Sequence, residues 1–331
     1  LGKDLSIAII PQVSSNSSDE TDEINYDLDT SIVIQSNLTK KIFYNNVDNP
    51  LGLKDLRKVR TFVKKEFKRN IDLCCLPAGA AGEYPQCFLN INREQEKNKI
   101  INSHLKTLAK QIKVLKVKNF FHAGGIYTIY GKFHLLNELI AAPNEKQINN
   151  VLKDLKINYF NILGGSSLVF KNNQWTKVIS KKFTLETKEK TIQKTSKVKY
   201  FYEKVPVLFN EKKLNLLFSK ATNKYFQILK NFKINSSWKI DFYIYQDLTL
   251  NSHIKINKKK SKLLKKYSLE YKDGGGKFSH LKCFMDLSLF EGFLKKKYTW
   301  NPAVAGSVMV FERKPNNFDP NLTSSLNFLN S

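Results

Sequence analysis

The chain has 331 residues, of which 41% are hydrophobic and 12% aromatic, a composition that excludes a largely disordered protein. It carries 55 Lys and Arg against 29 Asp and Glu, a formal net charge of +26. Such a charge repels itself unless a polyanion or salt offsets it, so the partner expected is nucleic acid or, less directly, an anionic membrane. No apolar run reaches the roughly 18 residues of a membrane span, and we expect no transmembrane segment.

Two further features of composition bear on origin and compartment. Lys, Asn, Ile and Phe are used heavily, as in proteins from AT-rich genomes, so mutation pressure accounts for part of the lysine content but not for its excess over acid. The four cysteines form no CxxC pair, and we expect no metal site and no cofactor. We interpret them as buried thiols of an intracellular protein, cytoplasmic or in an organellar matrix, while four Asn-x-Ser/Thr sequons leave secretion as the alternative.

The charge divides the chain. Residues 1–50 carry a net charge of −5, so the remainder carries +31. We therefore expect an acidic N-terminal segment over 1–50, a basic α/β region over 51–185 and a basic sheet-rich region over 200–331. The polar, Lys- and Thr-rich stretch 186–199 is interpreted as the linker or exposed loop between the last two.

Three helices are predicted in the first half of the chain. Apolar residues recur at helical spacing on one face of 54–69 and of 94–116, and the other faces are rich in lysine. A third helix is expected to begin near Asn144, directly after a proline. The stretch 74–82, with one proline and two glycines, is expected to break regular structure.

The remaining elements are predicted to be mainly strands. Two strand-like runs, 159–163 and 167–171, flank Gly164-Gly165, which suggests a tight hairpin. A helix is expected over 214–232, and strands are expected over 238–245, 253–256, 278–284 and 304–311. The fold class predicted is α+β, with a helix-rich N-terminal half and a mostly antiparallel sheet in the C-terminal half.

Lysine clusters are the strongest candidates for ligand contacts. Seven of the twelve residues from Lys255 to Lys266 are lysines. Lysine is a hydrated point charge suited to phosphates, whereas arginine, which reads guanine edges, is scarce here. The residues expected to contact nucleic acid through their charge are Arg57, Lys58, Arg60, Lys64, Lys65, Lys68, Arg69, Lys110, Lys113, Lys255, Lys258, Lys259, Lys260, Lys262, Lys265, Lys266, Lys295, Lys296 and Lys297.

Aromatic residues lie beside these basic segments, and aromatic rings can stack on unpaired bases. Tyr200 and Tyr202 would share one face of a strand, which makes them the best stacking candidates. Stacking on unpaired bases favours RNA over DNA as the partner.

The leading interpretation is a non-enzymatic RNA-binding protein, a component of a ribosome or another ribonucleoprotein from an AT-rich genome, with other proteins of that particle as further partners. The first alternative is an RNA-cleaving nuclease or toxin of plasmid or phage origin, in which His280 supplies acid–base catalysis beside Lys277 and Lys282. A viral nucleocapsid or coat protein and a peripheral membrane protein are the remaining alternatives.

Overall fold

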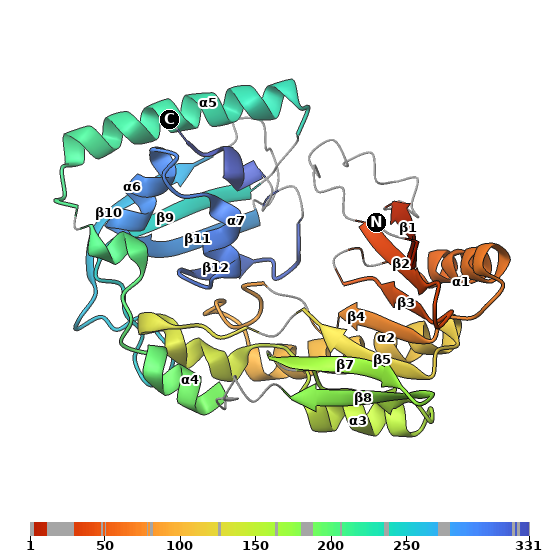
Figure 1. The fold of residues 1–331 in the computed structure, drawn as a ribbon. Coiled ribbons are helices and arrows are strands. Elements are labelled where there is room, and N and C mark those ends of the chain that lie inside the picture. Colours follow the sequence, from red (N-terminus) through yellow and green to blue (C-terminus); the bar gives the residue numbers. More distant parts are fainter. Residues whose placement is uncertain are drawn as a thin grey trace.

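A computed structural model gives the fold of the chain (Figure 1). The residues that it describes are 3–11, 30–47, 49, 51–77, 79, 82–124, 127–162, 165–179, 188–205, 207–234, 238–270, 279–319, 322 and 325–330.

Helices and strands are mixed along the whole chain, which confirms the α+β class. Figure 1 shows two groups of elements: a sheet with three helices, coloured red to yellow, and a second sheet beneath the long helix α5, coloured green to blue. The first group is built on a six-stranded sheet and the second on a four-stranded sheet.

The six strands of the first sheet lie in chain order, β1 to β6. The pairs β1–β2 and β2–β3 are antiparallel, whereas β3, β4, β5 and β6 run parallel. The strands are β1 (Leu5–Pro11), β2 (Thr30–Ser36), β3 (Ile42–Asn45), β4 (Leu73–Pro77), β5 (Asn119–Ala123) and β6 (Asn158–Tyr159). This sheet therefore takes strands from residues 1–50 as well as from 51–185.

Helices α1 (Leu53–Phe67), α2 (Arg93–Leu115) and α3 (Glu145–Lys153) connect the parallel strands, and all three predicted helices are confirmed. Their apolar faces pack on one core with the sheet. Leu56 and Val63 of α1 are fully buried, as is Phe120 of β5. Each connection joins neighbouring parallel strands, so every strand from β3 onward begins at the same edge of the sheet.

The four-stranded sheet has the order β10-β9-β11-β12. β9 and β11 are parallel at its centre, and the two outer pairings are antiparallel. The strands are β9 (Trp238–Gln246), β10 (Lys262–Leu269), β11 (Ser279–Asp286) and β12 (Val310–Lys314), and the helices are α5 (Glu211–Asn231), α6 (Leu287–Leu294) and α7 (Trp300–Ala305). Phe242, Phe290 and Tyr225 are among the buried rings of this second core.

Several shorter elements complete the structure. They are the strands β7 (Ser166–Lys171) and β8 (Gln174–Ile179), the helix α4 (Lys188–Thr195), and the 3-10 helices η2 (Gly131–Leu139), η3 (Phe201–Lys204) and η4 (Leu326–Phe328). Residues of η2 and the bridge between Phe88 and Phe311 belong to the second core, so the chain before residue 186 contributes to both cores.

The hairpin was predicted between the wrong pair of segments. The hairpin pairs β7 with β8, not 159–163 with 167–171. Its turn is Asn172-Asn173, and both residues have positive φ, 51° and 61°. Asparagine tolerates this conformation, which a two-residue turn between twisted strands requires, so Asn-Asn served where the prediction looked for Gly-Gly.

Other predicted elements also differ. The stretch 74–82 contains most of β4, because a short apolar run buried on both faces gives no alternating pattern. The first half combines the helices α1, α2 and α3 with the strands β1 to β6, so the prediction of a helix-rich half fits loosely. Residues 253–255 form a turn and bends, and Ile256 makes only an isolated bridge with Leu250. The range 304–311 divides between the end of α7 and the start of β12. Part of the expected linker, 188–195, is the exposed helix α4.

No helix within the described residues is both long enough and apolar enough to cross a membrane.

Candidate nucleic-acid interface

The amino edge of the parallel strands carries a basic groove. Two adjoining hollows of about 560 and 690 Å³ share Lys41, Lys118 and Asn119. Five cationic side chains line them, and Asp72 is the one carboxylate among the described residues that do so. The cations are Lys41, Lys68, Arg69, Lys116 and Lys118.

The position of these cations follows from the topology. Lys41 directly precedes β3, Lys68 and Arg69 follow α1 and lead into β4, and Lys116 and Lys118 follow α2 and lead into β5. Parallel strands bring all these approaches to one edge, so cations up to 77 positions apart in sequence line one groove.

Backbone conformation at this edge is unusual. The lysines at 40, 68, 116 and 156 lie in the turns that lead into β3, β4, β5 and β6, and all four have φ between 54° and 58°. A side chain in this left-handed conformation costs about 1 kcal/mol or more relative to glycine. Lysine after α1 and α2 also compensates the helix dipole, but Lys40 lies in a turn between strands, where no helix ends. A positive charge is thus placed where glycine fits the backbone better.

Polar side chains hold the strand ends together at the groove. Asp72 accepts from Lys41 Nζ at 2.8 Å and from the Ile42 backbone N–H at 3.0 Å. Asn119 donates to the Asp72 carbonyl at 2.9 Å, and Asn158 donates to Asn119 Oδ1 at 3.1 Å. This chain of contacts runs from β3 to β6, so the groove floor is fixed by the fold.

Aromatic rings form the other wall of the groove. Phe170 and Trp175 lie opposite each other in the β7–β8 hairpin, with ring centroids 5.1 Å apart. Lys41 Nζ lies 4.8 Å from the centre of the Phe170 ring. Both rings are half-buried and line the larger hollow, together with Tyr159 and Phe160. The groove therefore combines cations suited to phosphates with rings suited to bases.

The structure gives the predicted basic residues of the first group different surroundings. Lys68 and Arg69 line the groove. Arg60 instead donates to the Val114 carbonyl at 2.8 Å and ties α1 to α2. The remaining members of this set are exposed on α1 and α2, with Lys58 paired to Asp55; they are Arg57, Lys58, Lys64, Lys65, Lys110 and Lys113.

The predicted basic residues of the second group lie outside the groove. Lys265 pairs with Glu211 at 2.5 Å and Lys266 with Asp241 at 2.8 Å. Lys295 pairs with Glu291, which Lys213 also contacts. The other members are exposed: Lys255, Lys258, Lys259, Lys260, Lys262, Lys296 and Lys297. Three of the lysines in this set thus already have carboxylate partners.

The prediction that Tyr200 and Tyr202 stack on bases does not fit the structure. They lie at the start of η3, not on a strand, and each is only 1% exposed. Their rings stack on each other with centroids 5.4 Å apart, and the Tyr200 hydroxyl donates to the Tyr130 carbonyl. Because both rings are packed in the second core, bases cannot reach them in this conformation.

His280 lies on the face of the second sheet opposite α5 and is 30% exposed. Its Nε2 is 2.9 Å from Asp241 Oδ2, and Lys266 contacts the same oxygen. Burial alone would raise the pKa of Asp241, but hydrogen bonds from Lys266, Ser268 and His280 lower it below its ordinary value. Lys282, the predicted neighbour, pairs with Glu312 at 2.8 Å, and Lys277 lies outside the described residues.

Sequence reasoning missed most of the groove. Its missed members include Lys41, Lys118, Phe170 and Trp175. The available signal was a basic residue followed by asparagine at the approach to a strand, as in Arg69-Asn70 shortly before β4 and Lys118-Asn119 at the start of β5. Recognising that signal required β4 and β5 to be identified as neighbouring parallel strands first.

Comparison of the chain with protein-family models, curated proteins and solved structures finds no match.

Proposed function

We propose that the protein binds single-stranded RNA, or an unpaired segment of a structured RNA, in the groove at the amino edge of the first sheet. The observation that carries the proposal is that the described lining of one groove joins five cations and the Phe170–Trp175 pair with a single carboxylate, which is already paired. Basic grooves bordered by exposed rings suit single strands, since phosphates and bases are contacted together.

The binding mechanism follows from the two walls. Lys68, Arg69, Lys116 and Lys118 neutralise phosphates and release condensed counterions. Trp175 and Phe170 stack on one or two bases on the opposite side. Lysine predominates over arginine, so the groove discriminates little between sequences. This supports a role as a structural component of a ribonucleoprotein.

The compartment proposed is intracellular, either the cytoplasm or an organellar matrix. All four cysteines are buried and none forms a disulfide. Burial raises the pKa of the Cys74 thiol, and the neighbouring Cys75 raises it further, which keeps the thiol protonated and unreactive. Free thiols of this kind are usual in a reducing compartment.

Fluorescence anisotropy with a labelled single-stranded RNA tests the proposal. We expect the logarithm of the affinity to fall linearly with the logarithm of salt concentration, with a slope of about −0.7 per phosphate contact. Replacing Lys68, Arg69, Lys116 and Lys118 together by glutamine removes four cations from exposed positions. If all four contact phosphates, the slope becomes shallower by about 2.8.

A matched control removes the same charge elsewhere. Lys212, Lys220 and Lys230 are exposed on α5, and Lys233, which follows it, also has a positive φ of 52°. Their replacement by glutamine lowers the net charge by the same four units and is expected to change the slope by less than one contact. Equal effects of the two quadruple variants, or binding that does not respond to salt, would contradict the groove as the RNA site.

The His280 cluster supports a second candidate, RNA cleavage. An imidazole held by Asp241, with Lys266 beside it on an open sheet face, provides a base and a cation near each other. Incubation of wild type and His280→Ala with total RNA decides this candidate. Discrete cleavage by wild type that His280→Ala lacks would establish RNA cleavage. Intact RNA in both reactions would exclude cleavage and leave RNA binding as the one proposed function.

A further inference from the structure

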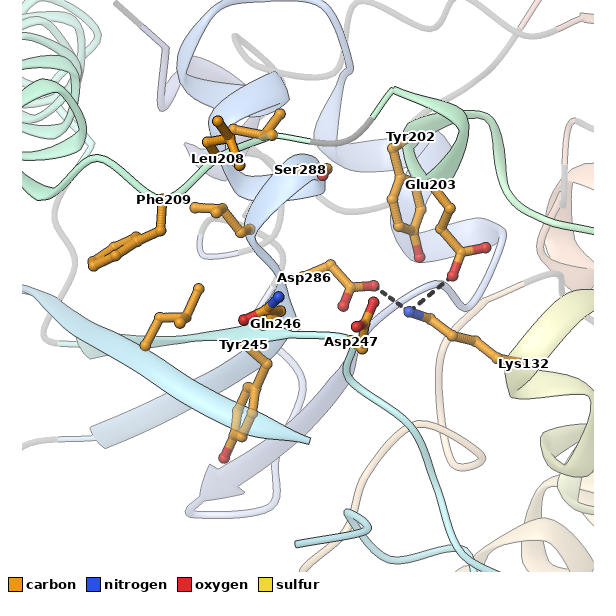
Figure 2. Close-up of a pocket in the computed structure, with 13 residues that line it drawn as sticks. Lys132, Tyr202, Glu203, Leu208, Phe209, Tyr245, Gln246, Asp247, Asp286 and Ser288 are labelled. Atoms are coloured by element: carbon orange, nitrogen blue, oxygen red, sulfur yellow. Dashed lines mark hydrogen bonds and ion pairs between the residues drawn. The ribbon is translucent and has the colours of Figure 1, made fainter. Parts of the chain in front are cut away.

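A second cavity, remote from the basic groove, has the opposite charge. It has a volume of about 410 Å³ and lies at the carboxyl ends of β9 and β11 (Figure 2). Among the described residues that line it, three are carboxylates, Glu203, Asp247 and Asp286, and one is a lysine, Lys132. In a chain of net charge +26 this is a local excess of two negative charges. RNA phosphates are therefore disfavoured here.

The floor of the cavity is built from one buried and two partly buried charged side chains. Lys132 Nζ lies 2.5 Å from Asp286 Oδ2 and 2.9 Å from Glu203 Oε1. Asp286 also accepts from the Leu248 backbone N–H at 2.7 Å, and burial raises the pKa of its carboxyl. The fold thus fixes two carboxylates and an ammonium at the end of the parallel strand pair, which is a usual position for ligand sites in such sheets.

One buried polar group on this floor lacks a partner. The Tyr202 hydroxyl points into the cavity toward Lys132 (Figure 2). Tyr202 is 1% exposed, and its hydroxyl lies near the Asp286 carboxyl without a hydrogen bond of ordinary length to any described group. Burial raises its pKa well above the ordinary value, and the nearby Asp286 charge raises it further. Buried hydroxyls are normally satisfied, so an unpaired one indicates the place of a ligand atom.

The mouth of the cavity combines a carboxylate with apolar side chains. Asp247 points inward in Figure 2 and forms no ion pair with any described residue. Leu208 is 92% exposed and Phe209 39% exposed, and both line the cavity with Tyr245 and Leu264. An exposed apolar rim of this kind marks an interaction site more often than ordinary surface does.

We propose that this cavity binds an organic cation, an alkylammonium or guanidinium group on an apolar stem. The charged head is placed between Asp247 and the Tyr202 oxygen, and the stem packs against Leu208 and Phe209. An anion is disfavoured at this position, because the Asp286 and Glu203 carboxylates already lie there and share the Lys132 ammonium. The volume suits a small amine or a single basic side chain.

Calorimetric titration of the full chain tests the proposal, with agmatine and cadaverine as free amines and an acetylated, amidated Leu-Arg-Leu peptide as a side-chain source. Glutarate and 1-pentanol are the anionic and neutral controls. We expect cations to bind and the controls to fail. Binding by the amines points to a small molecule, and binding by the peptide alone points to a partner protein's basic side chain. Absence of binding by all three cations at about 10 mM, which would nearly saturate a millimolar site, overturns the proposal.

Variants locate the binding. Asp247→Asn removes an exposed charge and is expected to weaken binding up to about fivefold, while Tyr202→Phe removes one hydrogen bond and weakens it by about the same factor. Asp154→Asn, at an exposed position after α3, is the matched control and leaves affinity unchanged. Equal affinities of Asp247→Asn, Tyr202→Phe and wild type would overturn the assignment of the site. RNA affinity of the Asp247→Asn variant stays at the wild-type value, so this proposal and the RNA site can fail independently.

Discussion

The two sheets present opposite charges at opposite ends of their parallel strands. Counting the described residues, the amino edge of the first sheet gathers five cations around one carboxylate, whereas the carboxyl edge of the second gathers three carboxylates around one lysine. Both arrangements arise from residues in turns and at strand ends that topology brings together. The net charge of +26 therefore describes neither site. Local placement at a sheet edge decides which ligand each can accept.

The two sites differ most in how deeply their lysine-paired carboxylates, Asp286 and Asp72, are buried. Asp286 is 5% exposed and holds both Lys132 and a backbone N–H, so Asp286→Ala leaves the partly buried Lys132 ammonium and a buried N–H with one partner fewer each. We expect it to lower the free energy of unfolding by about 3–5 kcal/mol. Asp72→Ala, at a side chain 21% exposed, is expected to cost about 1–2 kcal/mol. Urea unfolding of both variants measures the difference, and equal losses would show that the pocket charges are no more buried than those of the groove.

Base stacking is the next largest expected effect. Trp175→Ala should weaken single-stranded RNA binding by about 1–3 kcal/mol, while Trp175→Phe keeps a ring and most of the affinity. Trp238 and Trp300 are buried, at 3% and 4% exposure, so Trp175 is the half-exposed indole that RNA can quench. Tryptophan fluorescence titrations of wild type and Trp175→Phe measure this directly. Quenching that persists in the phenylalanine variant would place the RNA elsewhere.

Asp72, the one carboxylate among the described residues that line the groove, allows a substitution that should strengthen RNA binding rather than weaken it. Asp72→Asn keeps an oxygen for the Ile42 N–H but removes the negative charge that pairs with Lys41. We expect RNA affinity to rise about two- to fivefold at low salt, through an exposed interaction worth up to about 1 kcal/mol. The gain should disappear near 1 M salt, where screening is nearly complete. Anisotropy at both salt concentrations checks this, and a loss of affinity at low salt would contradict it.

The smallest effect is expected from a substitution of Arg60. Its guanidinium ties α1 to α2 through the Val114 carbonyl, so Arg60→Lys should lower the free energy of unfolding by about 1 kcal/mol and leave RNA affinity unchanged. Thermal unfolding and anisotropy on the same preparation separate the two roles. A drop in RNA affinity without a drop in stability would place Arg60 in the interface after all.

The sequence predicted those parts of the fold that depend on local periodicity. The helices α1, α2 and α5 could be predicted because each has one apolar face, whereas the residues on its other faces are rich in lysine. β4 was not readable, since Leu73–Pro77 is a short run almost wholly buried and has no alternation. The hairpin was predicted at the wrong place because its turn is Asn172-Asn173 rather than Gly164-Gly165.

The candidate sites were less predictable than the fold. Lys68 and Arg69 were found as members of a dense basic run, but Lys41 and Trp175 join them only through parallel pairing and the hairpin. Conversely, Tyr200 and Tyr202 looked accessible, because sequence does not show which aromatic residues a core will bury. Asp286 and Lys132 are 154 residues apart and carry no common motif.

Ultraviolet cross-linking of the protein to single-stranded RNA, followed by peptide mapping, tests the central claim most directly. The groove predicts cross-links concentrated at Phe170 and Trp175 in the β7–β8 hairpin, at Tyr159 of β6 and at Phe160, which follows it. Cross-links that cluster on β10 and α5, or that spread evenly over the exposed aromatic residues, would contradict the assignment of RNA binding to the amino edge of the first sheet.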